Sequence, residues 1–209
     1  AALLDALSLE PELDARQRIL ETAIELIGAH GLTALSMDEV ASRAGVSRAN
    51  LYRLFPGKQA LFVGVIHAYS PMDQVSQAAA VLSDEPPDVV MPELARTVYR
   101  VVAGPDAPGI GLLRAVFFEV GTLSPDAEAA ARELATTVFA SVGAYVLKQM
   151  QAGTLRMVHP ILALQAFVGP IFFHLVTRPM AERVLGLNME GEAAVTALAE
   201  GWLRSMKPD

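Results

Sequence analysis

The 209-residue sequence contains no cysteine. This excludes disulfide bonds, thiolate zinc sites and thiol redox chemistry. The chain also has no excess of positive charge: its formal net charge is −7, which argues against a general nucleic-acid binder that relies on a basic surface. Residues 1–13 hold three acids and no base, unlike a secretory signal, so we expect the cytoplasm as the compartment.

Motifs of catalysis and signals of β structure are also missing. The four histidines, at positions 30, 67, 159 and 174, do not have HExxH spacing, and neither a GxxxxGK[ST] loop nor a GxSxG elbow is present. We therefore do not expect an enzyme, a metal site or a cofactor. No alternating β-type run appears, whereas 53% of the residues are hydrophobic, which is ample for a buried core.

Residues 36–55 have the pattern of a helix, a tight turn and a second helix. Ser36 can cap the first helix, with Glu39 three residues later in the capping-box position. Gly45 predicts the turn, because glycine readily takes the left-handed conformation that ends helices. Ser47 can cap the second helix. The apolar positions expected to pack together are Met37, Val40, Ala41 and Ala44 in the first helix and Leu51, Leu54 and Phe55 in the second.

The second helix of this motif has a face that is left free to meet a ligand. At 100° per residue, Ala49, Tyr52 and Arg53 lie opposite the apolar face, with Arg48 and Asn50 on its flanks. Arginine offers a two-pronged donor for guanine or phosphate, tyrosine a hydroxyl for phosphate, and alanine permits close approach to a thymine methyl. An ordinary helical hairpin with a solvated face has the same spacing, so spacing alone leaves both alternatives open.

Residues 16–66 resemble the N-terminal domain of the TetR family of transcriptional repressors. The resemblance is carried by an amphipathic first helix that ends near residues 28–31, a serine-initiated second helix, the segment AGVSRANLYRLF and the following PGKQALF. It implies an all-helical fold and a homodimer that binds a palindromic operator. It also implies release from DNA when a small molecule occupies the C-terminal domain, with repression as the commoner outcome.

The resemblance also implies where the DNA contacts lie. Contacts of a recognition helix fall between Ser47 and Arg53, and the start of the next helix touches a phosphate at Lys58. The helix-turn-helix motif is expected at Ser36–Phe55. The expected DNA-binding residues are Ser36, Ser47, Arg48, Ala49, Asn50, Tyr52, Arg53 and Lys58.

Three parts are expected along the chain: an N-terminal arm at 1–13, a helix-turn-helix DNA-binding domain at 14–60, and an effector-binding and dimerisation domain at 61–209. Residues 14–60 hold six bases and five acids, so they sum to +1 and the remainder carries −8. The near-neutral residues 14–60 can bind phosphates through their arginines, while the acidic remainder of the chain is kept away from the duplex by repulsion. The arm is acidic and partly apolar where many relatives are basic. We expect it to pack on the protein or to lie disordered.

The chain beyond Lys58 reads as helices throughout, which gives an all-α protein of about nine helices. One helix is expected at 58–83, with a kink at Ser70-Pro71. Proline and glycine breaks at 85–88 and 104–109 bound the next helix, which ends near residue 103. The remaining helices are expected at about 110–120, 124–153, 160–177 and 191–206.

Residues 157–177 form a stretch of 21 residues without formal charge, long enough to span a membrane. Gln165, two histidines and the central Gly169-Pro170 argue against a span, and a helix that is apolar nearly all round is more simply buried in its domain and a partner. In TetR-like proteins the last two long helices form a four-helix bundle with their counterparts. The resemblance therefore places a homodimer interface at about Pro160–Thr177 and Gly191–Met206, and no membrane is expected.

The regulatory site is expected on the helices that surround the ligand cavity in relatives. The candidates for contact with an unidentified, small apolar or amphipathic effector are Phe117, Phe118, Tyr145, Phe173 and His174. Core packing is the alternative for each of them, and Trp202 is expected in the dimer interface or the core. Two other functions stay open: a helical ligand-binding or interaction protein that has lost DNA binding, and an enzyme without a recognisable motif.

Overall fold

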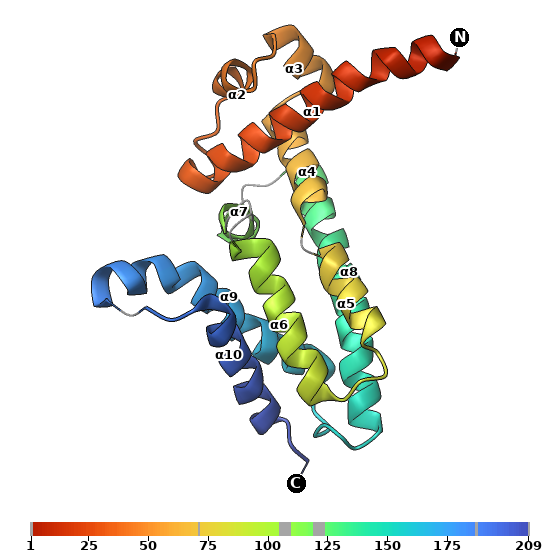
Figure 1. The fold of residues 1–209 in the computed structure, drawn as a ribbon, viewed down its shortest axis with the longest axis vertical. Helices are drawn as coiled ribbons and strands as arrows, with labels where there is room; N and C mark the ends of the chain where they lie inside the picture. Colours follow the sequence, from red (N-terminus) through yellow and green to blue (C-terminus); the bar gives the residue numbers. More distant parts are fainter. Residues whose placement is uncertain (1, 71, 105–109, 119–123, 187, 209) are drawn as a thin grey trace. The chain divides into compact units, whose positions relative to one another are not determined.

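The computed structural model describes residues 2–70, 72–104, 110–118, 124–186 and 188–208 (Figure 1). These residues form ten helices joined by turns and loops, with no strand among them, so the prediction of an all-α protein is confirmed. Their contacts divide the chain into two compact units. Unit 1 comprises residues 1–70 and 108–132, and unit 2 comprises residues 71–107 and 133–209.

Unit 1 is built around the first and fourth helices. It contains α1 (Ala2–His30), α2 (Met37–Ala44), α3 (Arg48–Leu54), α4 (Lys58–Tyr69), α7 (Gly111–Phe118) and the beginning of α8 (Pro125–Gln151). Ile19 and Ile27 of α1 and Phe62 and Ile66 of α4 are all within 1% of complete burial. The boundary expected at residue 60 therefore does not coincide with the edge of this unit, and it stays a prediction about functional parts.

Unit 2 contains the remainder of α8 with α5 (Met72–Val81), α6 (Pro87–Ala103), α9 (Pro160–Leu185) and α10 (Gly191–Ser205). Trp202 of α10 is 5% exposed and joins two helices of this unit. Its Nε1 donates a hydrogen bond of 2.9 Å to the Ala163 carbonyl of α9, and its ring meets Phe167 edge-on at 5.4 Å between centroids. Of the two positions expected for Trp202, the core of its own unit is the one observed.

The first helix is longer than expected. The separate arm predicted at 1–13 is instead helical from Ala2 and continuous with the rest of α1. Leucine and alanine make up eight of these thirteen residues, and both have high helix propensity. This helix-forming composition explains why the acidic segment extends α1 instead of forming a separate arm.

Two helix ends also differ from the prediction, and both involve proline. The helix expected at 58–83 is two helices, because Ser70 has an extended backbone (φ −65°, ψ 131°), the conformation favoured before proline. In contrast, α9 continues eight residues past Thr177 with Pro179 inside it, and ends at Gly186 in the left-handed conformation (φ 64°). The Arg178–Glu182 ion pair, 2.6 Å between Nε and Oε1, supports these last turns.

Helices α1 and α7 approach each other closely at Gly28 and Gly111, where backbone meets backbone. A Cβ added to Gly111 would lie 2.1 Å from the Cα of Gly28, so no side chain fits between the two helices at this point. The contact fixes residues 111–118 against α1 although they are more than 80 positions apart in the sequence. The side chains of Phe117 and Phe118 lie outside the described part of the structure.

The turn between α2 and α3 is set by Gly45. Its φ is 67°, its N–H donates to the Ser42 carbonyl, and the N–H of Val46 donates to the Ala41 carbonyl at 3.0 Å. This pair of hydrogen bonds satisfies carbonyls that the end of α2 would otherwise leave unpaired. A Cβ at Gly45 would meet no atom within 4 Å, so only the backbone conformation requires glycine here.

Replacing Gly45 by alanine should lower the free energy of unfolding by about 1 to 2 kcal/mol, because an L-residue with a Cβ is strained in the left-handed conformation. Asparagine tolerates that conformation better, so Gly45→Asn is the matched control and should cost less. Urea denaturation of the three proteins measures the difference. Equal stability of Gly45→Ala and Gly45→Asn would show that the backbone of this turn does not limit stability.

Candidate nucleic-acid interface

Both helices of the motif begin with a serine cap. Ser36 has an extended backbone, and its Oγ accepts the Glu39 N–H at 3.5 Å. Ser47 also has an extended backbone, and its Oγ accepts the Asn50 N–H at 3.1 Å. These bonds satisfy N–H groups that a helix cannot pair internally. The two caps and Gly45 therefore fix where α3 starts.

The apolar face of α3 is buried in unit 1. Leu51 is fully buried and Phe55 is 3% exposed. The Phe55 ring lies below the Arg16 guanidinium of α1, 5.3 Å from its Cζ, and so close to α4 that a Cβ on Gly64 would come within 2.7 Å of it. These contacts hold the opposite face of α3 outward.

The outward face of α3 carries the residues expected to contact DNA. The structure leaves Ser36, Ser47, Arg48, Ala49, Tyr52 and Arg53 exposed, and Asn50 and Lys58 half-buried. Tyr52 is 47% exposed, which is unusual for a large aromatic side chain with a hydrophobic ring. An exposed tyrosine beside an exposed arginine on a short helix provides donors that can reach phosphates and base edges.

Two of these side chains are oriented by neutral acceptors. Arg53 donates from Nη2 to Oδ1 of Asn50 at 2.9 Å, one helical turn away. Lys58 donates from Nζ to the Thr33 carbonyl at 2.8 Å, which ties the start of α4 to the loop before α2. An ammonium group has three donors, so Lys58 can keep this bond and still bind a phosphate.

Two further residues of this interface were missed in the sequence. Asp38 of α2 pairs with Arg48 of α3 at 2.7 Å between Oδ2 and Nη2. Arg16, which covers the Phe55 ring, is one of the six bases counted among residues 14–60. The available signal for Asp38 was an acid in the first turn of α2, which the helix dipole alone explains.

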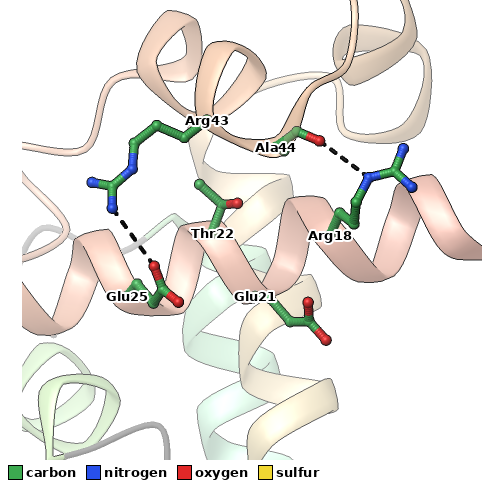
Figure 2. A pocket seen from close by; sticks show the side chains of 6 residues that line it. All are labelled: Arg18, Glu21, Thr22, Glu25, Arg43 and Ala44. Atoms are coloured by element: carbon green, nitrogen blue, oxygen red, sulfur yellow. Dashed lines mark hydrogen bonds and ion pairs between the residues drawn. The ribbon is translucent and has the colours of Figure 1, made fainter.

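An open depression between α1 and α2 lies in the same unit (Figure 2). Figure 2 shows the Arg18 side chain reaching from α1 to the last carbonyl of α2, with Nε donating to Ala44 O at 3.1 Å. It also shows Arg43 of α2 reaching back toward Glu25 of α1, 3.7 Å between Nη2 and Oε2. Glu21 and Glu25 balance the two arginines, so these groups join α1 to α2 and give the depression no excess positive charge.

The candidates for effector contact fall in different environments. Tyr145 is 4% exposed and donates its hydroxyl to the Glu85 carbonyl at 2.8 Å; burial raises the pKa of this tyrosine, and Asp88 and Glu85 add to the rise. The Nε2 of His174 is buried without a hydrogen-bond partner among the described residues, and burial lowers the pKa of this histidine. Phe173 is 69% exposed. The structure thus does not gather these three around one described cavity.

Helix α9 exposes an apolar stripe. Leu162, Phe173, Met180 and Val184 are between 59% and 72% exposed, and at 100° per residue they lie within roughly 40° of one another around the helix axis. Among the described residues, α9 is the one helix long and apolar enough to cross a membrane by length and composition. Only 28% of its most apolar window is buried within the chain. Monomeric soluble proteins rarely expose a continuous apolar surface of this kind.

Comparison with known proteins finds relatives of the segment that contains α2 and α3. Residues 19–65 match the model of the family described as "Bacterial regulatory proteins, tetR family". The HTH-type transcriptional regulator Rv0472c of Mycobacterium tuberculosis is 34% identical over 90 residues, which are 43% of this chain and 37% of that protein. MftR of the same organism is 44% identical over 43 residues, 21% of this chain and 22% of that protein. The matched segment thus spans less than half of these curated relatives.

Solved structures extend the similarity of the fold to nearly the whole chain. The regulator FadR from Bacillus subtilis, in complex with stearoyl-CoA, has a TM-score of 0.72 at 16% identity, covering 91% of this chain and 98% of that one. AibR, in complex with isovaleryl coenzyme A and operator DNA, has a TM-score of 0.69 at 18% identity, covering 93% and 98%. Residues 19–65 of this chain thus match the TetR family of bacterial regulatory proteins, and its described helices have the fold of solved structures of that family.

Proposed function

We propose that the protein is a sequence-specific DNA-binding transcriptional regulator, a homodimeric repressor that a small molecule releases from a palindromic operator. The observation that carries the proposal is the outward face of α3, where Ala49, Tyr52 and Arg53 are exposed on a helix fixed by Ser47 and by the buried Leu51. A helix can enter the major groove of DNA, and exposed side-chain donors on it can then reach the base edges. A regulator of this kind acts on the chromosome, which places it in the cytoplasm.

Relatives named as transcriptional regulators favour this function over an enzyme. The second alternative, an interaction protein that has lost DNA binding, would not need to keep a tyrosine and an arginine exposed together on α3. It would also not need Lys58 at the start of α4, next to that surface. The DNA-binding set of eight residues expected from the sequence is therefore the set we propose.

The homodimer is proposed to form through α9 and α10. The apolar stripe of α9 also contains Ala166 and Gly169, and a Cβ at Gly169 would meet no atom within 4 Å. Within one chain nothing requires glycine at this exposed position, whereas a second helix packed there would need the space. Helix α10 adds small exposed residues at Ala193 and Ala197. A two-fold pairing would present two copies of α3 to successive major grooves, about 34 Å apart.

The effector is proposed to act by shifting the distance between the two copies of α3. A ligand that binds more tightly to a dimer with the wrong spacing depletes the form that fits the operator. The solved complexes of FadR and AibR contain acyl-CoA molecules, so stearoyl-CoA and isovaleryl-CoA are rational first probes for an amphipathic effector. Tyr145 and His174 remain proposed contacts together with Phe117 and Phe118, whereas we assign Phe173 to the dimer surface.

Selection of bound fragments from a random duplex library tests the function directly. The protein should enrich a palindromic sequence with half-sites about one helical turn apart. Repeating the selection with stearoyl-CoA or isovaleryl-CoA should reduce the enrichment if either molecule is of the right class. Recovery of fragments without a common sequence would refute sequence-specific regulation, whichever ligand is present.

Lys58 and Arg53 should have different roles on the selected operator. Lys58→Ala should weaken binding to all duplexes and reduce the slope of log K against log salt by about 0.9, the value for one phosphate contact. Arg53→Ala should instead remove about 1 to 3 kcal/mol of discrimination at one base pair. Fluorescence anisotropy over a salt series measures both, with Lys207→Ala, from unit 2, as the control. If Lys58→Ala weakened binding to the operator alone, Lys58 would not be a phosphate contact.

Phe173→Glu should convert the dimer to a monomer at micromolar concentration, because it places a charge in the middle of the apolar stripe. Val81→Glu is the matched control: its side chain is 82% exposed on α5, outside the stripe. Sedimentation velocity distinguishes monomer from dimer. A Phe173→Glu protein that remains dimeric would rule out this face of α9 as the interface.

A further inference from the structure

The first arginine of the recognition helix is held by a carboxylate from the preceding helix. Arg48 is the first residue of α3 and Asp38 is the second residue of α2, and 2.7 Å separate Nη2 from Oδ2. Both side chains are more than half exposed, 71% and 53%. The ion pair thus lies in solvent at the start of both helices of the motif.

Stability of the fold does not explain this pair. Exposed ion pairs contribute little to folding, since water and salt screen them and two side chains must be ordered. The junction of α2 and α3 is already fixed by Gly45 and by the cap of Ser47. The pair can therefore be opened at little cost in folding free energy. Its larger effect is on the binding of a charged ligand.

The effect on DNA is electrostatic. Each cation that neutralises a phosphate raises the affinity for every duplex, whatever its sequence, because it releases a bound counterion. Arg48 is well placed to do this, since it lies beside Ser47 and Ala49 on the exposed side of α3. While Asp38 holds its guanidinium, phosphate must compete with a carboxylate for the same donors.

We propose that Asp38 is an affinity-limiting residue that withholds Arg48 from the phosphates of DNA. The inference rests on the DNA-binding function proposed above. Withholding one cation lowers the affinity for every duplex by about the same factor, because a phosphate contact does not depend on sequence. Asp38 therefore sets the overall strength of DNA binding and leaves the ratio of operator to random-duplex affinity to the contacts with base edges.

The neighbouring acid supplies a matched control. Glu39 follows Asp38 in the first turn of α2, is 47% exposed, and pairs with Arg43 at 3.7 Å between Oε1 and Nη1. Glu39→Gln removes the same charge from the same helical turn but leaves the Arg48–Asp38 pair intact. A general loss of repulsion affects both variants, whereas release of Arg48 affects Asp38→Asn alone.

The experiment compares the wild-type protein, Asp38→Asn, Glu39→Gln, Arg48→Ala and the double variant Asp38→Asn/Arg48→Ala on the selected operator and on a random duplex. Asp38→Asn should bind the random duplex roughly five- to tenfold more tightly at 0.1 M salt, with a salt slope steeper by about 0.9. Its affinity for the operator should rise by about the same factor, so the ratio of operator to random-duplex affinity should stay the same. The increase should vanish in the Arg48→Ala background.

Two results would overturn the role of Asp38. One is equal behaviour of Asp38→Asn and Glu39→Gln, and the other is an increase that persists without Arg48. Either would leave the proposed function standing, provided that the wild-type protein binds its operator selectively. Failure of the wild-type protein to prefer any sequence would instead refute the proposed function, and the role of Asp38 with it.

Discussion

A helix of seven residues has too few internal hydrogen bonds to persist alone in water, so the recognition surface depends on the burial of one face of α3. Leu51 is fully buried, and the Phe55 ring is enclosed between Arg16 of α1 and Gly64 of α4. This burial lets the opposite face be polar and exposed without loss of the helix. It also explains why α4, although it follows the motif, is part of the same compact unit.

Sequence reasoning located the motif because its signals are local. The caps at Ser36 and Ser47 and the left-handed Gly45 each follow from the residue type and its near neighbours, and the structure contains all three. Proline was harder to interpret, because it breaks a helix at Ser70 and is accommodated inside α9 at position 179. The outcome depends on the surrounding contacts, and those are not written in the adjacent residues.

Contacts between distant positions could not be predicted in this way. The Arg48–Asp38 pair depends on how the turn at Gly45 directs two helices, and the Gly28–Gly111 approach joins segments with five helices between them. A glycine in a helical sequence reads as a weak helix former rather than as a point of backbone contact. The effector candidates were limited for the same reason: their positions on helices were predictable, but the hydrogen bond from the Tyr145 hydroxyl to the Glu85 carbonyl was not.

The homodimer proposed to form through the apolar stripe of α9 would make the lifetime of the protein depend on its amount in the cell. In that case Leu162, Phe173, Met180 and Val184 are exposed to water until a newly made chain meets a second copy. Chaperones and proteases recognise such surfaces, and the waiting time lengthens as the chain becomes scarcer, since pairing depends on concentration. A cell that makes few copies would therefore lose a larger fraction of them to turnover, so the level of active regulator would fall more steeply than its rate of synthesis.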